Sequence, residues 1–160
     1  MDHCGAFRQR GATTANQPLK GTIMTTIDTT ASANNADLAA LILRVTNGVL
    51  FLLHAGLKLF VFTPAGTAGF FESIGLPGFL AYLVIAAELL GGIALIVGYK
   101  TRIVSLGLIL VLLGAIFTVH LSAGFFFSNA NGGWEYPAFW AVTLLVLSLL
   151  GDGAYALGKR

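Results

Sequence analysis

The chain has 160 residues, of which 56% are hydrophobic and 10% charged, with a net charge of +2. Its mean hydropathy of +0.83 is too high for an ordinary soluble domain, and neither its charge nor its motifs support a nucleic-acid partner. The single cysteine, Cys4, excludes an intrachain disulfide and Cys-x-x-Cys redox chemistry.

Residues 1–36 are rich in Thr, Ala, Asn and Gly and show no apolar periodicity. This composition predicts a disordered tail. The basic residues of the tail are followed by polar sequence, so the pattern is not that of a signal peptide. Met24 is an alternative translation start, because Lys20-Gly21 has the form expected if a ribosome-binding site had been translated. The mass of the natively expressed protein would decide between the two starts.

The first predicted membrane span covers residues 38–62, which exceeds the ~20 residues that a helix needs to cross a bilayer. Several polar side chains inside it share one helical face with a phenylalanine. These residues are Arg44, Asn47, Phe51, His54 and Lys58. A charge at the bilayer centre costs at least ~2.5–3.5 kcal/mol, so this face should meet protein while the opposite face meets lipid.

A second span is predicted over residues 77–99, with Pro77 as its first residue and Glu88 near its middle. Small residues flank the Glu88 carboxyl, as close helix packing in lipid requires. The residues on that side are Ala81, Glu88, Gly91, Gly92 and Leu95. Residues 63–76 before the span predict a short helix in the membrane interface. Residues 99–102 after it predict a tight turn to an antiparallel neighbour.

The third span is predicted over residues 103–123, with His120 near its end. Small side chains on one face of this span predict a packing seam. They are Gly107, Val111, Gly114 and Thr118. The fourth span is predicted over residues 136–157, although it is strictly apolar only to Leu150. Glu135 precedes it and is predicted to act as a helix cap.

Outside the first span, which contains Arg44 and Lys58, lysine and arginine occur only in segments that would lie on one side of the membrane. They are Arg8, Arg10, Lys20, Lys100, Arg102, Lys159 and Arg160. The connections over residues 63–76 and 124–135 carry none. The positive-inside rule therefore predicts an all-α integral membrane four-helix bundle over residues 37–158, with both the N- and C-termini in the cytoplasm.

At 1.5 Å per residue, most ionisable groups of the spans fall in the outer half of the membrane. They are His54, Lys58, Glu88, His120 and Glu135. Lys58 and Glu88 are open to two interpretations, a structural ion pair or, with His54, a site that handles protons or binds a ligand. His120 is predicted to contact a loop, with a role in the site as the alternative. Glu135 is likewise a cap or a site residue.

Arg44 lies alone on the inner side and is predicted to extend towards the cytoplasmic headgroups. Together with Asn47 it is interpreted as a structural polar residue. Haem is disfavoured because His54 and His120 differ in depth by most of ~10 Å. No spacing of ligands indicates a metal site. No catalytic residue is assigned from the sequence.

Over about residues 41–157 the sequence resembles the DoxX family of four-helix bacterial inner-membrane proteins. The matching stretches are Arg44 followed by GVLFLLHAGLKLF, then FFESIGLP, AELLGGIALIVGYKTR, AIFTVHLSAGFF, GGWEYP and GDGAYAL. The family commonly has His-Gly where this chain has His54-Ala55-Gly56, and Gly-Pro-Gly where it has Gly151-Asp152-Gly153. The family motifs carry over to Arg44, His54, Lys58, Glu88, His120 and Glu135.

The resemblance implies a multi-pass protein of the bacterial inner membrane. The family takes its name from a membrane subunit of a quinone-linked sulfur-oxidising oxidoreductase, and some members are associated with thiol and oxidative-stress complexes. We therefore expect a membrane subunit of a quinone-linked redox or oxidative-stress complex that acts, if it is an enzyme, with redox partner proteins. A quinone is the cofactor to test, with His54 and Lys58 as donors, Glu88 as a proton relay and Phe51 lining the slot.

Two other classes of protein fit the same residues. The first is a small membrane transporter, which with four spans would need to form a homo-oligomer and would use the polar cluster for translocation. The second is a non-catalytic membrane scaffold or assembly factor, in which the polar residues only specify helix packing. Substrate uptake that fails when Lys58 is replaced would favour the transporter, whereas recovery of stability on replacing both Lys58 and Glu88 would favour the scaffold.

Overall fold

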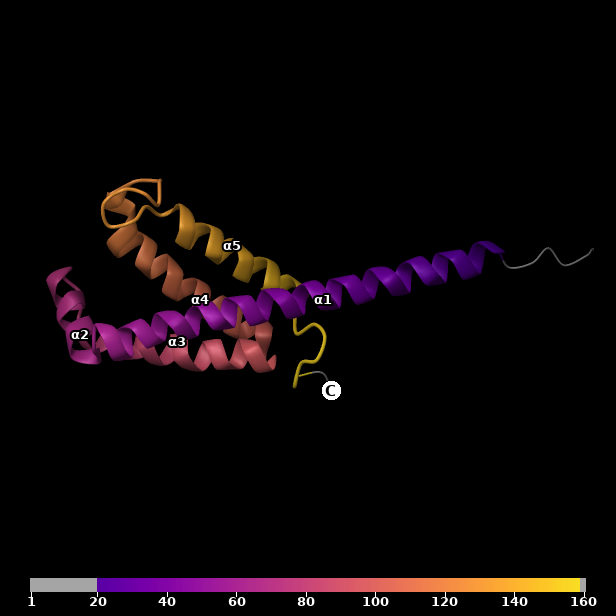
Figure 1. Cartoon of the computed structure of the whole chain (residues 1–160), viewed down its shortest axis with the longest axis horizontal. Helices are drawn as coiled ribbons and strands as arrows, with labels where there is room; N and C mark the ends of the chain where they lie inside the picture. The colour runs from indigo at the N-terminus through magenta and orange to yellow at the C-terminus, as the bar shows by residue number, and fades with distance from the viewer. Residues whose placement is uncertain (1–19, 159–160) are drawn as a thin grey trace, which may run out of the picture.

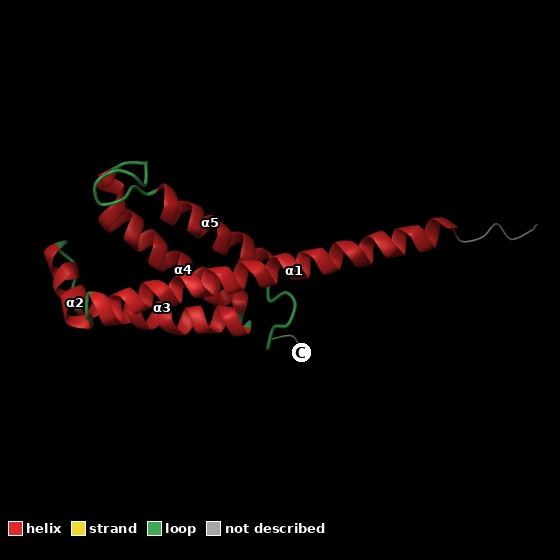
Figure 2. Cartoon of the chain, in the orientation of Figure 1, coloured by secondary structure: helices red, strands yellow, loops and turns green. Residues whose placement is uncertain are grey.

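The computed structural model describes residues 20–158, with side chains from residue 35 onward. Every regular element in this range is helical, as the all-α prediction requires, and no strand occurs among the described residues (Figure 2). The elements are α1 (Lys20–Gly56), the π-helical turn η1 (Leu57–Val61), α2 (Pro64–Ser73), α3 (Phe79–Val97), α4 (Thr101–Ala115), the π-helical turn η2 (Ile116–His120), the 3-10 turn η3 (Leu121–Ala123) and α5 (Glu135–Leu150).

Three helical segments of the described part are long and apolar enough to cross a membrane. They are Asn35–Val61, Phe79–Val97 and Thr101–Ala123, and they match the first three predicted spans. The apolar helix α5 has 16 residues and is therefore about 24 Å long, less than the ~30 Å hydrocarbon core. Its predicted continuation to residue 157 is wrong. Gly151 and Gly153, with φ of 89° and 68°, turn the chain out of the helix.

The first helix begins earlier than predicted. Residues 20–36, expected to be part of a disordered tail, form the beginning of α1, which projects past the other helices (Figure 1). No glycine or proline occurs between Gly21 and Gly48, so nothing in that stretch interrupts a helix that the apolar segment has already nucleated. Residues 1–19 lie outside the described part of the chain, and the choice between the two translation starts stays a prediction.

The helices associate as two pairs, α1 with α3 and α4 with α5. The pairs lie close together near the turn between α3 and α4 and diverge towards α2 and the loop that precedes α5 (Figure 1). Gly48 and Gly92 let α1 and α3 approach closely, because a Cβ on Gly92 would lie 2.9 Å from the Gly48 carbonyl oxygen. The predicted packing side of α3 is confirmed, since Ala81, Glu88, Gly92 and Leu95 are buried.

The small-residue seam predicted on the third span is not buried. Gly107, Gly114 and Thr118 are exposed, and a Cβ added at either glycine would meet nothing within 4 Å. Helix α4 instead buries Leu108 and Leu112, which join the core formed with the other helices. Leucine side chains make more van der Waals contacts than glycine, and such contacts drive helix association in lipid, so this face determines the orientation of α4 within the chain.

The connections between helices follow the predicted turns closely. The short helix α2 occupies most of residues 63–76, and its cap Thr63 accepts a hydrogen bond from the Gly66 amide at 3.1 Å. Helix α3 begins two residues after Pro77, whose carbonyl accepts the Leu80 amide at 3.0 Å. A tight turn then joins α3 to α4.

Candidate functional site

Arg44 is buried, with 1% of its surface exposed. Its guanidinium donates hydrogen bonds to the carbonyls of Ile96 at 2.8 Å and Ala154 at 2.6 Å. The predicted extension towards headgroups is therefore wrong. The last carbonyls of a helix lack partners within the helix and carry partial negative charge, so the end of α3 provides acceptors for a buried cation.

The chain after α5 folds back over this end of the bundle. The Leu157 and Gly158 amides donate to the carbonyls of Val97 and Gly98, both at 3.0 Å. Asp152 accepts the Thr101 amide at 3.0 Å. Residues 151–158, called the C-terminal clasp below, thus link α1, α3 and α4, and Arg44 lies at their centre.

Asn47 connects α1 to α5 in the middle of the bundle. It is buried, its amide nitrogen donates to the Leu43 carbonyl at 2.8 Å, and its oxygen accepts the Thr143 hydroxyl at 3.1 Å. The bond from Thr143 joins α5 to α1, whereas the bond to Leu43 lies within α1, and both fit the structural interpretation of this residue.

Lys58 and Glu88 form an ion pair between η1 and α3. The ammonium nitrogen lies 2.9 and 2.8 Å from the two carboxylate oxygens, and the side chains are 20% and 7% exposed. Lys58 sits on a π-helical turn closed by the Phe62 amide and the Leu57 carbonyl at 2.9 Å. Such turns occur often at functional sites, and nothing in the periodicity of the sequence indicated this one.

His54 lies one helical turn before Lys58 and packs on aromatic rings rather than on the ion pair. Its ring centroid is 4.9 Å from that of Trp140, which in turn lies 4.4 Å from Phe51. The Nδ1 atom is 2.9 Å from the Leu50 carbonyl oxygen. Because a carbonyl only accepts, this contact places a proton on Nδ1 and leaves Nε2 of the neutral ring as an acceptor.

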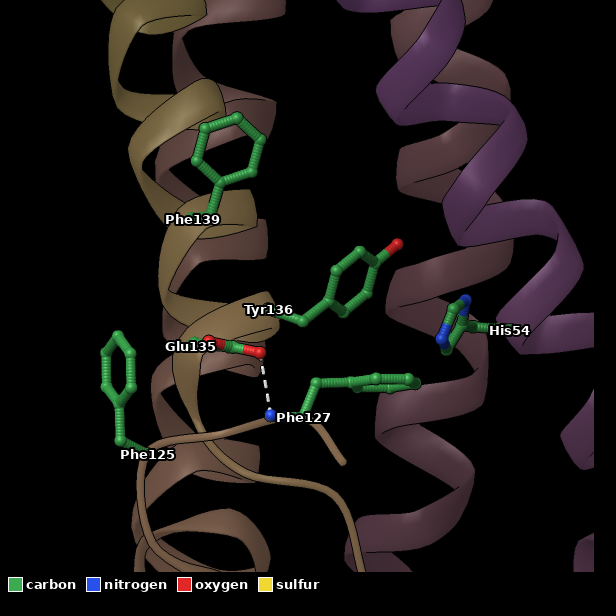
Figure 3. A pocket seen from close by; sticks show the side chains of 6 residues that line it. All are labelled: His54, Phe125, Phe127, Glu135, Tyr136 and Phe139. Atoms are coloured by element: carbon green, nitrogen blue, oxygen red, sulfur yellow. Dashed lines mark hydrogen bonds between the residues drawn. The ribbon is translucent and has the colours of Figure 1, made fainter. Parts of the chain in front are cut away.

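A pocket of about 870 Å³ lies where α1 faces the start of α5 and the preceding loop. Its lining is mostly aromatic, and Figure 3 shows the Tyr136 side chain reaching from α5 towards α1, with its hydroxyl on the side of His54. The lining residues are His54, Phe125, Phe127, Glu135, Tyr136 and Phe139. The pocket therefore combines flat apolar walls with an imidazole, a phenol and a carboxylate.

Two predicted site residues hold the loop that borders this pocket. The Glu135 carboxylate accepts the Phe127 amide at 2.7 Å (Figure 3), so it fixes the loop instead of capping its own helix. His120, the last residue of η2, contacts the Gly132 carbonyl through Nδ1 at 2.8 Å, which is the kind of loop contact predicted for it. Both residues thus shape the pocket wall.

Comparison with known proteins identifies the protein family. The sequence profile of the DoxX family matches residues 39–121, just over half of the chain. The chain belongs to the DoxX family. The matched range contains both members of the ion pair and His54, whereas the α5 side of the pocket lies beyond it.

Two curated relatives agree with this assignment. The chain is 41% identical over 121 residues to a protein of Bacillus subtilis strain 168 named putative oxidoreductase CatD. The aligned segment covers 76% of the chain and 85% of the relative. The chain is also 33% identical over 128 residues to the inner membrane protein YqjF of Escherichia coli K12, covering 77% of the chain and 92% of the relative. No solved structure matches the chain.

The residues predicted for the site separate into three groups in this DoxX protein. Lys58 and Glu88 are paired, His54 and Glu135 line the pocket, and His120 supports the loop. Among the described residues no three His, Cys, Asp or Glu side chains lie together as metal ligands would. The aromatic walls of the pocket were not predicted from the sequence, because their rings meet only where the loop before α5 faces α1.

Proposed function

We propose that this DoxX protein is a multi-pass subunit of the bacterial inner membrane that binds a quinone for a redox complex. The single observation that carries the proposal is the aromatic pocket beside His54. Its volume of about 870 Å³ lies within the usual 300–1,000 Å³ range of small-molecule sites. Flat aromatic side chains are suited to sandwich a planar ring.

The polar groups of the pocket suit the oxygens of such a ring. Tyr136 has a hydroxyl that can donate to a ring carbonyl or accept from a ring hydroxyl. The Nε2 atom of His54 can accept a proton from a ring hydroxyl. A quinone, when bound, would supply two-electron redox chemistry, while these side chains would orient the ring and exchange protons with it.

Lys58 lies four residues after His54, on η1, and forms an ion pair with Glu88 of α3. A lysine that is 20% exposed beside a carboxylate that is 7% exposed could return a proton to His54 after transfer. We therefore assign the pair to proton handling in the proposed function, with the rival that it only fixes the packing of α1 on α3.

We further propose that α5 completes a fourth span and that both termini lie in the cytoplasm. Three arguments support this topology: α5 packs along α4, the aromatic loop before it can lie in the interface, and Lys100 and Arg102 lie at the same end of the bundle as the C-terminal clasp. The positive-inside rule places that end in the cytoplasm.

Lipoquinone retention tests the proposed function. The protein would be purified from bacterial membranes in mild detergent, and its quinone content would be measured by extraction and mass spectrometry. We expect retained quinone in the wild type and a loss of at least fivefold in His54→Leu and Tyr136→Phe. The control Phe117→Leu changes an exposed aromatic outside the pocket. Quinone content that is absent in the wild type, or equal in all four proteins, would refute the proposal and favour a scaffold.

A further inference from the structure

The indole of Trp140 has a buried N–H group without a hydrogen-bond partner among the described residues, although the side chain is only 4% exposed. Such a group is uncommon, because an unpaired buried donor costs about 1–3 kcal/mol. The other unpaired buried side-chain atoms in the described part belong to Arg44, Thr101 and Ser105. Those residues lie at the end of the bundle that carries the C-terminal clasp.

Trp140 lies directly behind the wall of the pocket. Its ring centroid is 4.9 Å from that of His54 and 5.8 Å from that of Tyr136, and both of those residues line the pocket. Phe51, at 4.4 Å, closes the inner side of the indole. Trp140 is therefore separated from the pocket by the side chains of the lining and not by a helix.

Tyr136 is the lining residue best able to uncover the indole. Its side chain is 39% exposed, and its hydroxyl makes no hydrogen bond within the part of the chain that the structure describes. Exposed side chains without such restraints change rotamer within nanoseconds. A turn of Tyr136 would extend the pocket to the Trp140 ring, which Tyr136 now contacts, without any movement of α5.

We propose that Trp140 is the hydrogen-bond donor for a carbonyl oxygen of the ring bound in the pocket. The inference rests on the proposed function and narrows its ligand class to planar rings that carry an acceptor oxygen, as opposed to hydrocarbon rings or acyl tails. The bound oxygen would satisfy the buried donor, while the Phe51 ring would support the far side of the indole. Trp140 is thus a positioning group that favours rings carrying an acceptor oxygen.

Nuclear magnetic resonance of the indole N–H tests the proposal directly. The chain contains two tryptophans, so Trp134→Phe leaves Trp140 as the only indole and assigns its signal. The ¹⁵N-labelled full-length protein in nanodiscs would be titrated with menadione and with 2-methylnaphthalene, which has the same ring without carbonyls. We expect the Trp140 proton to move downfield with menadione alone, because only a carbonyl can accept its hydrogen bond.

Affinity measurements provide the second readout. Loss of one hydrogen bond predicts about two- to tenfold weaker menadione binding in Trp140→Phe, with 2-methylnaphthalene binding changed far less. The matched control Trp134→Phe should bind menadione as the wild type does. An effect of Trp140→Phe on both probes equally would show that the indole only packs, and this would overturn the inference.

The outcomes also separate this inference from the proposed function. If menadione binds the wild type but leaves the Trp140 signal in place, the pocket stands and the donor role fails. If the signal is already downfield without a probe in protein from which lipoquinone has been extracted, an internal water satisfies the N–H and the donor role fails again. If menadione does not bind at all, the proposed function fails together with the inference.

Discussion

The sharpest test of the packing concerns the Lys58–Glu88 ion pair. Its two N–O distances are 2.9 and 2.8 Å, and the carboxylate side is 7% exposed while the lysine side is 20% exposed. Removing one member leaves the other charge buried without a partner, a change that typically costs 3–5 kcal/mol. Because both side chains keep some contact with solvent, we expect about 3 kcal/mol for Lys58→Met and slightly less for Glu88→Leu.

The double variant Lys58→Met/Glu88→Leu should recover most of this loss. A buried ion pair can be replaced by apolar residues of similar volume with little net change, so we expect stability within about 1 kcal/mol of the wild type. The measurement is the free energy of unfolding by SDS titration in mixed micelles. Lys100→Met, at an exposed turn residue outside the bundle, is the control for loss of a lysine.

Additive losses would refute the reasoning, because independent effects mean that the two charges do not interact. A stable double variant would also show whether the ion pair takes part in quinone binding. A stable double variant that no longer retains quinone assigns proton handling or binding to the pair, whereas one that retains quinone fully assigns it to packing alone.

Three further outcomes follow from the contacts. Gly92→Ala should lower the free energy of unfolding by about 1–3 kcal/mol, because the new Cβ would lie 2.9 Å from a carbonyl oxygen of α1. The control Gly114→Ala places its Cβ in open space and should be neutral or stabilise the protein by up to about 1 kcal/mol. Unfolding titrations compare the two variants. Arg44→Met should lower the free energy of unfolding by about 3 kcal/mol or more, because it leaves carbonyls at the end of α3 without hydrogen-bond donors. Faster proteolysis of the C-terminal clasp is the measurement. In a background without the native cysteine, Gly66→Cys should react with an impermeant maleimide in intact cells, whereas Lys100→Cys should react only after lysis. Labelling of Lys100→Cys in intact cells, with Gly66→Cys labelled only after lysis, would overturn the topology.

Much of the fold follows from periodicity and from breaking residues. Of the four spans predicted from apolar runs, the first three match long apolar helices. The polar stripe on the first span correctly indicated its inward face, since Arg44, Asn47 and Phe51 are all buried. These outcomes depend on the cost of exposing polar groups to lipid, which acts on every residue of a span. The predicted seam at Gly107 failed because small size permits close packing but does not supply the area that decides which face is buried.

The charged residues of the candidate site could be predicted from the sequence, whereas the aromatic walls of its pocket could not. The sequence places Lys58 and Glu88, which carry opposite charges, in the outer half of the membrane, and the ion pair that was one of their two interpretations is present in the structure. The pocket depends on the path of the loop 124–134, which is held by the contact of His120 with the Gly132 carbonyl and by the hydrogen bond that Glu135 accepts from the Phe127 amide. Such long-range contacts leave no periodic signal in the sequence. The sequence therefore identified His120 and Glu135 as candidate site residues but did not predict how they arrange the loop.

The burial of Arg44 has a consequence for biosynthesis. Its acceptor at Ala154 is 110 residues further along the chain, so the first helix enters the membrane before the ribosome has made one of the groups that neutralise its charge. The bundle can close only after the last few residues emerge. Any fusion partner joined to the C-terminus therefore needs a spacer that leaves this final stretch free to dock.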